Sequence, residues 1–573
     1  MASVDGATRR GGGDGSIRRR RVLVFPLPFQ GHINPMLQLA GALHGRRGGG
    51  GGELSVTVLH TRFNAIDPSR YPELAFAEVP DGIPPDVAAN GNIVDIIVAL
   101  NVAMDGGESS PSFRDVLASV VAADDEGRKP RASCLIIDGN LMAAQKTAAE
   151  LGLPTLVLRT GSAACLGCYL AYPALLQKGY LPPKESQLYE PVEELPPLRV
   201  RDLYYTSNAN QELVRKVLGW IAETARNSNG VVINTFDELE PAELERIRRE
   251  LDGDGVAIVL AVGPLHKLSP MNAGGSLHLC PDRSCIEWLD TQATGSVLYV
   301  SFGSLASLDS NEFLEVAWGL ESSGQPFLWV VRPDLVKGLD KPSLPDGFER
   351  AVEGRGKVIK WAPQQEVLAH HAVGGFWTHN GWNSTLESVS EGVPMICKPQ
   401  FADQMLNTRY LEAVWAVGFE LVGKLERGEI KKAIKRLMVE KEGAEIRERA
   451  KELKKKMDQC LESSGSSQIA INRITIIRTS EGATTTASKG PFQHRDELVF
   501  EVLARIAETV RNSNGVVIST FEELEPMELE RVHGELGDDS VATVLATGPL
   551  HRLSSMNTGS NTFNLRQDQS CIE

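Results

Sequence analysis

The sequence is poor in three features that mark large classes of proteins: long apolar runs, clustered cysteines and surplus positive charge. No apolar run is long enough to cross a bilayer, so we expect no membrane span. The 573 residues carry a formal net charge of −15, which argues against nucleic acid as the main partner. Among the eight cysteines only Cys165 and Cys168 form a close pair, and no second pair or histidine stands beside them. We therefore expect buried, apolar cysteines and no zinc site.

Residues 1–20 are polar, glycine-rich and basic, and we expect a disordered tail there. The arginines at 18–21 precede the apolar segment VLVFPLPF, an order also found in secretory signal peptides. However, Pro26 and Pro28 interrupt this segment and no small-residue cleavage site follows it. A first buried strand is the better interpretation, and the cytoplasm is then the expected compartment.

Apolar segments alternate with helical segments over residues 21–262, as in VLVFPLP, LSVTVLHT, SCLIID, PTLVLRT and NGVVINTF. A Pro/Gly/Ser-rich connection at about 263–283 separates them from a second alternating unit that begins with SVLYVSFGS and continues to about residue 440. Strands that alternate with helices predict parallel sheets covered by helices on both faces. The expected fold class is therefore α/β with two domains, 21–262 and 263–440, followed by charged helices at 441–473.

The end of the chain repeats an earlier part of it. Residues 497–573 match residues 212–287, and 43 of the 61 positions in 212–272 recur at an offset of 285, so the two segments are copies. The second copy holds only part of a sheet, and residues 474–496 are expected to be a linker. We interpret the copy as a fragment of a tandem neighbouring gene or as a faulty gene model.

Residues 361–404, WAPQQEVLAHHAVGGFWTHNGWNSTLESVSEGVPMICKPQFADQ, are the most informative run. GGFWTH predicts a strand, NGW a turn, and NSTLESVSEGVP a helix capped by Asn383 and Ser384 and ended by Gly392. The N-terminus of a helix carries free N–H groups and a partial positive charge. This arrangement suits a pyrophosphate group.

The residue types in this run also suit a nucleotide sugar. Trp361 offers a flat face on which a base can stack, and Glu387 can accept hydrogen bonds from both hydroxyls of a ribose. Single residues have structural alternatives: Ser384 and Glu387 have the spacing of a capping box, and Trp361 and Trp382 could be core aromatics. The density of the run favours a binding site. Its further polar members, suited to phosphate or sugar, are His379, Asn383, Ser384, Asp403 and Gln404.

The run closely resembles the signature segment of plant UDP-dependent glycosyltransferases of small molecules, and the resemblance extends over about residues 21–472. It implies the GT-B fold, in which two Rossmann-like domains face each other across a cleft and the second holds the donor. It implies that Trp361 stacks on uracil, that Ala362 and Gln364 lie nearby, and that Glu387 binds the ribose. The implied contacts to the diphosphate are His379, Asn383 and Ser384, and those to the sugar are Trp382, Asp403 and Gln404. Glutamine at position 404 resembles the glucose-preferring version of the motif.

A candidate catalytic pair stands in the first domain. FPLPFQGHINP places His32 in a loop after the first strand and before a helix, and Asp138 ends the strand SCLIID. Sheets of this kind bind ligands at the carboxyl ends of their strands, and a histidine oriented by a buried carboxylate is a competent general base. In the family that the chain resembles, the base and its orienting acid align with these two residues. The resemblance adds Ser304 near the phosphate and Thr160 near the sugar.

The implied reaction is an inverting transfer of glucose from UDP-glucose, a co-substrate, to a hydroxyl of a small metabolite, without a cofactor or metal. The first domain resembles enzymes that glucosylate benzoxazinoids, flavonols such as quercetin, or hormones such as cytokinins. We expect variable segments such as 80–110 and 165–210 to form the acceptor pocket, and the protein to be a monomer. The alternatives are an inactive UDP-sugar-binding protein and a misassembled tandem gene product. A dinucleotide oxidoreductase is disfavoured because no glycine-rich fingerprint follows a strand.

One point is left open by the sequence. The family closes with a helix that packs on the first domain, whereas the residues after Gln468, INRITIIRTS, depart from that pattern.

Overall fold

The computed structural model describes residues 20–46, 53–106, 111–122, 130–205, 211–253, 256, 258–269, 281–339, 341–476, 516–518 and 544–546. The expected N-terminal tail, except Arg20, lies outside the described residues, and so does most of the expected linker and duplicate. The chain divides into two units, Met1–Ala483 and Thr484–Glu573, which are considered separately.

Seven parallel strands form the first sheet, in the order β3-β2-β1-β4-β5-β6-β7. They are β1 (Arg20–Phe25), β2 (Leu54–His60), β3 (Ala75–Glu78), β4 (Ala132–Asp138), β5 (Thr155–Arg159), β6 (Gly230–Ile233) and β7 (Val259–Ala261). The order reverses between β1 and β4, and such a switch point leaves a crevice at the carboxyl ends of the two strands. This is where the sequence places both candidate catalytic residues.

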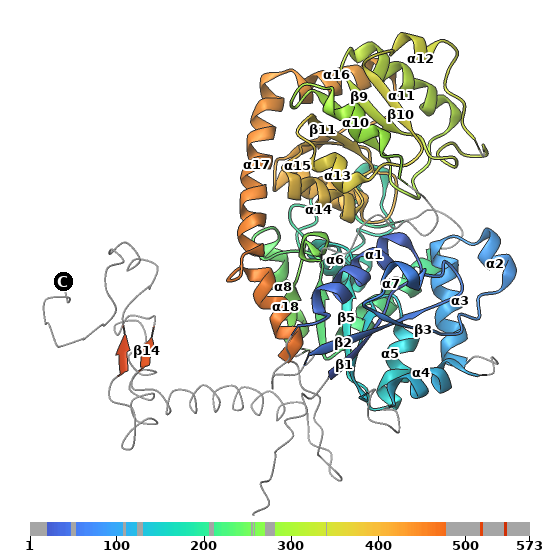
Figure 1. Ribbon diagram of the computed structural model, residues 1–573, viewed down its shortest axis with the longest axis vertical. Helices are drawn as coiled ribbons and strands as arrows, with labels where there is room; N and C mark the ends of the chain where they lie inside the picture. The colour runs from blue at the N-terminus through green and yellow to red at the C-terminus, as the bar shows by residue number, and fades with distance from the viewer. Residues whose placement is uncertain are drawn as a thin grey trace, which may run out of the picture. The chain divides into compact units, whose positions relative to one another are not determined.

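Helices cover both faces of this sheet (Figure 1). Side chains alternate along a strand, so Leu23 and Phe25 of β1 enter one core while Val22 and Val24 enter the other. The helices are α1 (Gln30–Leu43), α2 (Pro85–Asn90), α3 (Ile93–Gly106), α4 (Phe113–Val121), α5 (Met142–Glu150), α6 (Ala163–Gln177), α7 (Gln211–Arg226), α8 (Pro241–Gly253) and α9 (Leu265–Leu268). Short 3-10 helices occur at η1 (Pro68–Arg70), η2 (Glu185–Gln187) and η3 (Val200–Asp202).

The second sheet has six parallel strands in the order β10-β9-β8-β11-β12-β13, with its own switch point between β8 and β11. The strands are β8 (Val297–Ser301), β9 (Phe327–Val330), β10 (Gly356–Ile359), β11 (Val373–Thr378), β12 (Met395–Cys397) and β13 (Gly418–Glu420). Its helices are α10 (Ser284–Asp290), α11 (Ser310–Ser323), α12 (Phe348–Ala351), α13 (Gln364–Ala369), α14 (Trp382–Glu391), α15 (Gln404–Ala413) and α16 (Arg427–Met438). The predicted α/β class with two parallel sheets is confirmed.

The question of the closing helix is settled by α17 (Lys441–Leu461) and α18 (Ser466–Ile476). α17 runs alongside the second domain, and α18 reaches the first (Figure 1). Ala470, Ile471 and Ile474 of α18 are buried in the core that contains Val22 and Val24 of β1. The INRITI sequence therefore continues a helix and supplies its apolar face. The linker expected from residue 474 can start only after Ile476.

Within the second unit, β14 (Val516–Ile518) pairs in parallel with β15 (Val544–Ala546). Val516 stands opposite Val544, as Val231 of β6 stands opposite Val259 of β7. The copied sequence thus pairs its two strands in the register of the original.

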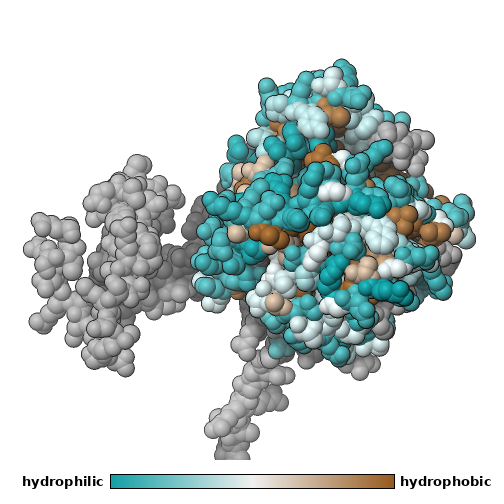
Figure 2. Space-filling model, turned by 90° about the horizontal axis from the view of Figure 1, so that it is seen from above, coloured by the Kyte–Doolittle hydropathy of each residue, from teal (hydrophilic) through white to brown (hydrophobic). Residues whose placement is uncertain are grey.

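The described surface is mostly hydrophilic in the view of Figure 2, with apolar residues in separate small patches. None of the described helices combines the length and the apolar character that crossing a bilayer requires. The six cysteines among the described residues are buried and free, and Cys165 and Cys168 lie on α6 as expected.

Candidate active site

A cavity of about 1030 Å³ is lined by residues of both sheets. Apolar side chains from α3, α6 and α7 form one wall of its first-domain end. The part of this wall on α7 lies outside the segments expected to form the acceptor pocket. These apolar residues are Ile93, Val94, Ile97, Tyr169, Val214, Val217, Leu218 and Ile221. The predicted site residues that line the cavity are His32, Thr160, Ser304, Trp361, Ala362, Gln364, His379, Trp382, Asn383, Ser384, Glu387, Asp403 and Gln404. Asp138, the remaining one, lies behind His32.

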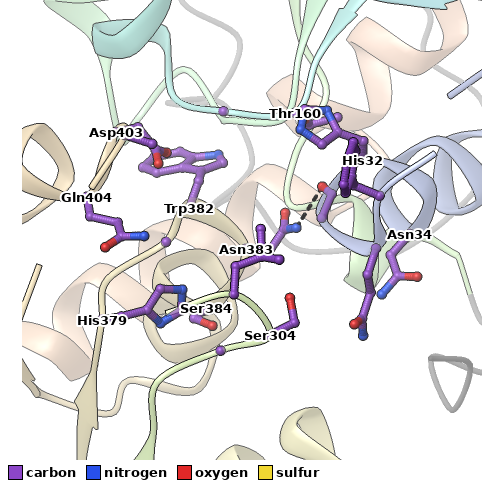
Figure 3. Close-up of a pocket in the computed structure, with 18 of the residues that line it drawn as sticks. His32, Asn34, Thr160, Ser304, His379, Trp382, Asn383, Ser384, Asp403 and Gln404 are labelled. Carbon is purple, nitrogen blue, oxygen red and sulfur yellow. Dashed lines mark hydrogen bonds between the residues drawn. The ribbon is translucent and has the colours of Figure 1, made fainter. Parts of the chain in front are cut away.

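His32 lies in the first turn of α1, and not in a loop before the helix as expected. The helix was expected to begin after His32, but it begins at Gln30 and contains Pro35. A proline inside a helix has no N–H for the carbonyl four residues earlier, which here belongs to Gly31. That carbonyl instead accepts a hydrogen bond from Nδ2 of Asn383 in the second domain at 3.0 Å, drawn as the dashed line in Figure 3.

The structure brings His32 and Asp138 together because β1 and β4 are neighbouring strands. Oδ2 of Asp138 is 2.7 Å from Nδ1 of His32, and the aspartate is only 1% exposed. Its Oδ1 accepts hydrogen bonds from the backbone N–H and the side-chain amide of Asn140 at 3.0 and 2.7 Å. Burial by itself would raise the pKa of Asp138, but the charge and hydrogen bond of His32, the charge of Arg159 and the Asn140 N–H together hold that pKa below its usual value. The carboxylate therefore stays ionised and holds the proton of His32 on Nδ1.

Thr160 follows the last residue of β5 and stands next to this pair. Its Oγ1 is 3.1 Å from Nδ1 of His32. Figure 3 shows both residues on one side of the site, with His379 and Gln404 on the other.

The turn between β11 and α14 was predicted correctly, but the N-terminal cap of the helix was not. α14 begins at Trp382, and its N-cap is Gly381, which offers no side chain, so Asn383 and Ser384 lie inside the first turn. The turn is fixed by Asn380, whose backbone is left-handed at φ 65° and whose carbonyl accepts from Nδ2 of Asn407 at 3.1 Å. The predicted helix end at Gly392 is present, with φ 67°. No side chain caps the N-terminus of α14, which leaves its first N–H groups for a ligand.

Glu387 is the centre of a hydrogen-bond network at the other end of the cavity. Its carboxylate accepts from Nε2 of Gln364 at 2.7 Å and from Nε2 of Gln365 at 2.9 Å. The amide of Gln364 also donates to Oγ of Ser384 at 3.0 Å, so the capping-box alternative for Ser384 and Glu387 is wrong. Burial raises the pKa of Glu387, while the two glutamine hydrogen bonds oppose that rise.

His379 is held between two glycines. A Cβ at Gly303 would lie 2.4 Å from its ring and a Cβ at Gly381 would lie 2.6 Å from its Nε2. Burial, and then the charge of Arg332, lower the pKa of His379 to about 4. The imidazole is neutral near pH 7 and can offer one N–H as a hydrogen-bond donor.

The three residues assigned to the sugar make structural contacts as well. Nε1 of Trp382, which is 4% exposed, donates to the carbonyl of Asn234 in the first domain at 2.7 Å. Oε1 of Gln404 accepts from the backbone N–H of Gln400 at 2.8 Å, which leaves its Nε2 as the donor. Burial raises the pKa of Asp403. Among the residues that the structure describes, no group of three or more His, Cys, Asp and Glu side chains is placed to hold a metal ion.

The chain is similar in sequence and in structure to known proteins. The sequence profile of a family described as "UDP-glucoronosyl and UDP-glucosyl transferase" matches residues 263–464. The chain is 47% identical over 452 residues to DIMBOA UDP-glucosyltransferase BX9 of Zea mays, which covers 78% of the chain and 92% of the relative. The chain belongs to the UDP-glycosyltransferase family.

This UDP-glycosyltransferase is also 42% identical to UDP-glycosyltransferase 76G1 of Stevia rebaudiana, over 78% of the chain and 95% of that protein. Among solved structures, it resembles Phytolacca americana UGT2 complexed with UDP-2fluoro-glucose and pterostilbene, with a TM-score of 0.64, 27% identity and coverage of 80% and 98%. It also resembles a Polygonum tinctorium UDP-glucosyltransferase capable of glucosylating indoxyl, with a TM-score of 0.65, 29% identity and coverage of 80% and 98%. These likenesses show the GT-B arrangement of the two sheets.

Sequence reasoning missed several polar residues that line the cavity of this UDP-glycosyltransferase, among them Gln365 and Arg159. Gln365 could have been found from the sequence, since it adjoins Gln364 in the signature segment. Arg159 could also have been found, because it is a charged residue at the end of the largely apolar segment TLVLR.

Proposed function

We propose that this enzyme transfers glucose from UDP-glucose to a hydroxyl of a small, largely apolar metabolite, with inversion at the anomeric carbon and His32 as the general base. The observation that carries the proposal is the 2.7 Å contact between His32 and Asp138 in a cavity that is apolar at one end and polar at the other. With its Nδ1 proton held by the aspartate, His32 has Nε2 left to accept a proton from the acceptor hydroxyl.

The proposed reaction is a direct displacement at the anomeric carbon. As His32 takes the proton, the acceptor oxygen forms a bond to the anomeric carbon, and the bond from that carbon to the β-phosphate oxygen breaks. Negative charge then builds on the leaving UDP. The uncapped N-terminus of α14, the N–H of neutral His379 and the hydroxyls of Ser304 and Ser384 would stabilise that charge. We propose that these groups make a metal ion unnecessary.

The donor assignments follow the polar end of the cavity. Trp361 would stack on the uracil with Ala362 beside it, and the Gln364–Glu387 network would bind the ribose hydroxyls. Asp403 and Nε2 of Gln404 would contact the sugar. The amide of Asn383 and the indole N–H of Trp382 are engaged with the first domain, so we assign them to holding the two domains together around the donor.

The acceptor class is narrowed by the apolar wall of α3, α6 and α7. Such a wall suits a flat aromatic or heterocyclic compound, and a relative acts on DIMBOA while a structural neighbour binds pterostilbene. We propose benzoxazinoids, flavonols and hormone-like aromatics as the acceptors to screen first.

The test incubates purified protein with UDP-glucose and a panel of these acceptors. Products are identified by mass spectrometry, and their anomeric configuration is determined by NMR. His32→Ala should abolish transfer and leave UDP affinity nearly unchanged. A parallel loss of UDP binding would refute the assignment of His32 as the base. A wild-type protein that binds UDP but forms no glucoside from any acceptor would instead favour the inactive UDP-sugar-binding protein.

A further inference from the structure

Arg159 is a buried cation that lines the cavity and has no hydrogen-bond partner. Its side chain is 6% exposed, its Nε has no acceptor, and no hydrogen bond or ion pair joins its guanidinium to another residue that the structure describes. Arg332, buried to a similar degree, shows the ordinary situation: its Nε donates to the Gly303 carbonyl at 2.9 Å and its Nη1 pairs with Asp334 at 2.7 Å. Buried charges are normally paired in this way, because an unpaired one is costly.

No hydrogen bond to another described residue fixes the guanidinium of Arg159, although its charge interacts with the nearby carboxylates of Asp138 and Asp403. Its Cζ lies 5.5 Å from the centre of the Tyr169 ring, a cation–π contact. Its Nη1 crosses Gly139 so closely that a Cβ there would be 2.7 Å away. The planar group is thus oriented on two sides, while its N–H groups remain free to bind something in the cavity.

The position of Arg159 beside His32 and Asp138 indicates which ligand its guanidinium would bind. Arg159 and Thr160 are consecutive, and Thr160 is 3.1 Å from Nδ1 of His32. The strands β5 and β4, which end at Arg159 and Asp138, are paired. A ligand group that meets the guanidinium would therefore lie close to the catalytic pair, where the acceptor is expected to bind.

We propose that Arg159 binds a carboxylate or carbonyl oxygen of the acceptor next to the hydroxyl that is glucosylated. A guanidinium can present two parallel N–H groups to two oxygens, a geometry that lysine cannot match. The site then selects acceptors whose reacting hydroxyl lies ortho to an anionic or strongly accepting oxygen. This inference rests on the proposed function, because it concerns the acceptor of the same reaction.

The test compares two phenols that differ at the ortho position, 2-hydroxybenzoate and 2-methylphenol. Arg159→Met keeps an unbranched apolar stem and removes the donors, and Arg159→Lys keeps the charge without the fork. Arg159→Met should lower kcat/KM for 2-hydroxybenzoate by about 10- to 100-fold, the effect of losing a charge-assisted hydrogen bond. The loss for 2-methylphenol, which reports any indirect effect through Asp138, should be much smaller, and kcat/KM of Arg159→Lys for 2-hydroxybenzoate should fall between the wild type and Arg159→Met. Equal losses for both phenols, with a shifted pH–rate profile, would overturn the proposal and make Arg159 a support for Asp138.

A binding measurement separates this inference from the proposed function. Calorimetry of the UDP-loaded protein should show that 2-hydroxybenzoate binds the wild type more tightly than Arg159→Met. If this difference in affinity is seen but no acceptor is ever glucosylated, the proposed function is refuted and the binding of an acceptor oxygen by Arg159 is supported. If glucose is transferred but the wild type and Arg159→Met bind 2-hydroxybenzoate equally well, the role of Arg159 is refuted and the proposed function is supported.

Discussion

Replacing Gly303 by alanine should disable donor binding through a single methyl group. Gly303 has φ 68°, in the left-handed region, and its Cβ would lie 2.4 Å from the ring of His379. The backbone strain of a side chain in this conformation is roughly 1–2 kcal/mol. The overlap with the imidazole adds to that strain, and Gly381 lies close to Nε2 of the same ring, which limits how the ring can move. His379 must therefore leave its position in the cavity.

Gly324→Ala is a matched control in the same domain. Gly324 has nearly the same backbone, with φ 70°, and a Cβ there would have nothing within 4 Å. Both variants should lose similar thermal stability from strain, a fall in Tm of roughly 2–8 °C if 1–2 kcal/mol is lost in a domain of this size. Only Gly303→Ala should also weaken UDP binding in calorimetry and lower kcat/KM for UDP-glucose. If the two variants bind UDP equally well, His379 does not act on the donor and the argument is refuted.

Three further predictions concern pH, the duplicated tail and metal. The pKa of His379 is lowered to about 4 from 6.5, so between these values the unfolded chain binds a proton that the folded chain does not. The free energy of unfolding should therefore fall as the pH drops through this window; in urea melts His379→Gln should flatten that fall, and an unchanged slope would contradict the burial of His379. Deleting 477–573 should leave glucoside formation unchanged, whereas deleting 466–573 also removes Ile471 and Ile474 from a core and should cost roughly 3–6 kcal/mol; an inactive 477–573 deletion would show that the tail belongs to the enzyme. Treatment with EDTA should not slow the transfer, and loss that Mg²⁺ restores would disprove the metal-free proposal.

The strands that the sequence predicted are those with long apolar runs, such as SCLIID, which forms β4. The strands it did not name are β3, AFAE, β7, VLA, and β13, GFE, at the edges of the two sheets. Edge strands of three or four residues give no periodic signal, and they form because an adjacent strand offers backbone groups to pair with. The start of α1 was also misjudged, since the helix was expected only after His32 and it begins at Gln30.

The succession of strands and connecting segments along the sequence determined which residues face the cavity. Residues that follow parallel strands converge at one edge of a sheet, and for this reason His32, Asp138 and His379 could be placed from the sequence alone. The tertiary structure decided the contacts that depend on distant segments. Asn383 donates to the carbonyl that Pro35 leaves without a helical partner, and Nε of Arg159 lies buried without a hydrogen-bond partner. No local pattern encodes such contacts, because each depends on how two separately folded sheets meet and on which partners burial leaves within reach.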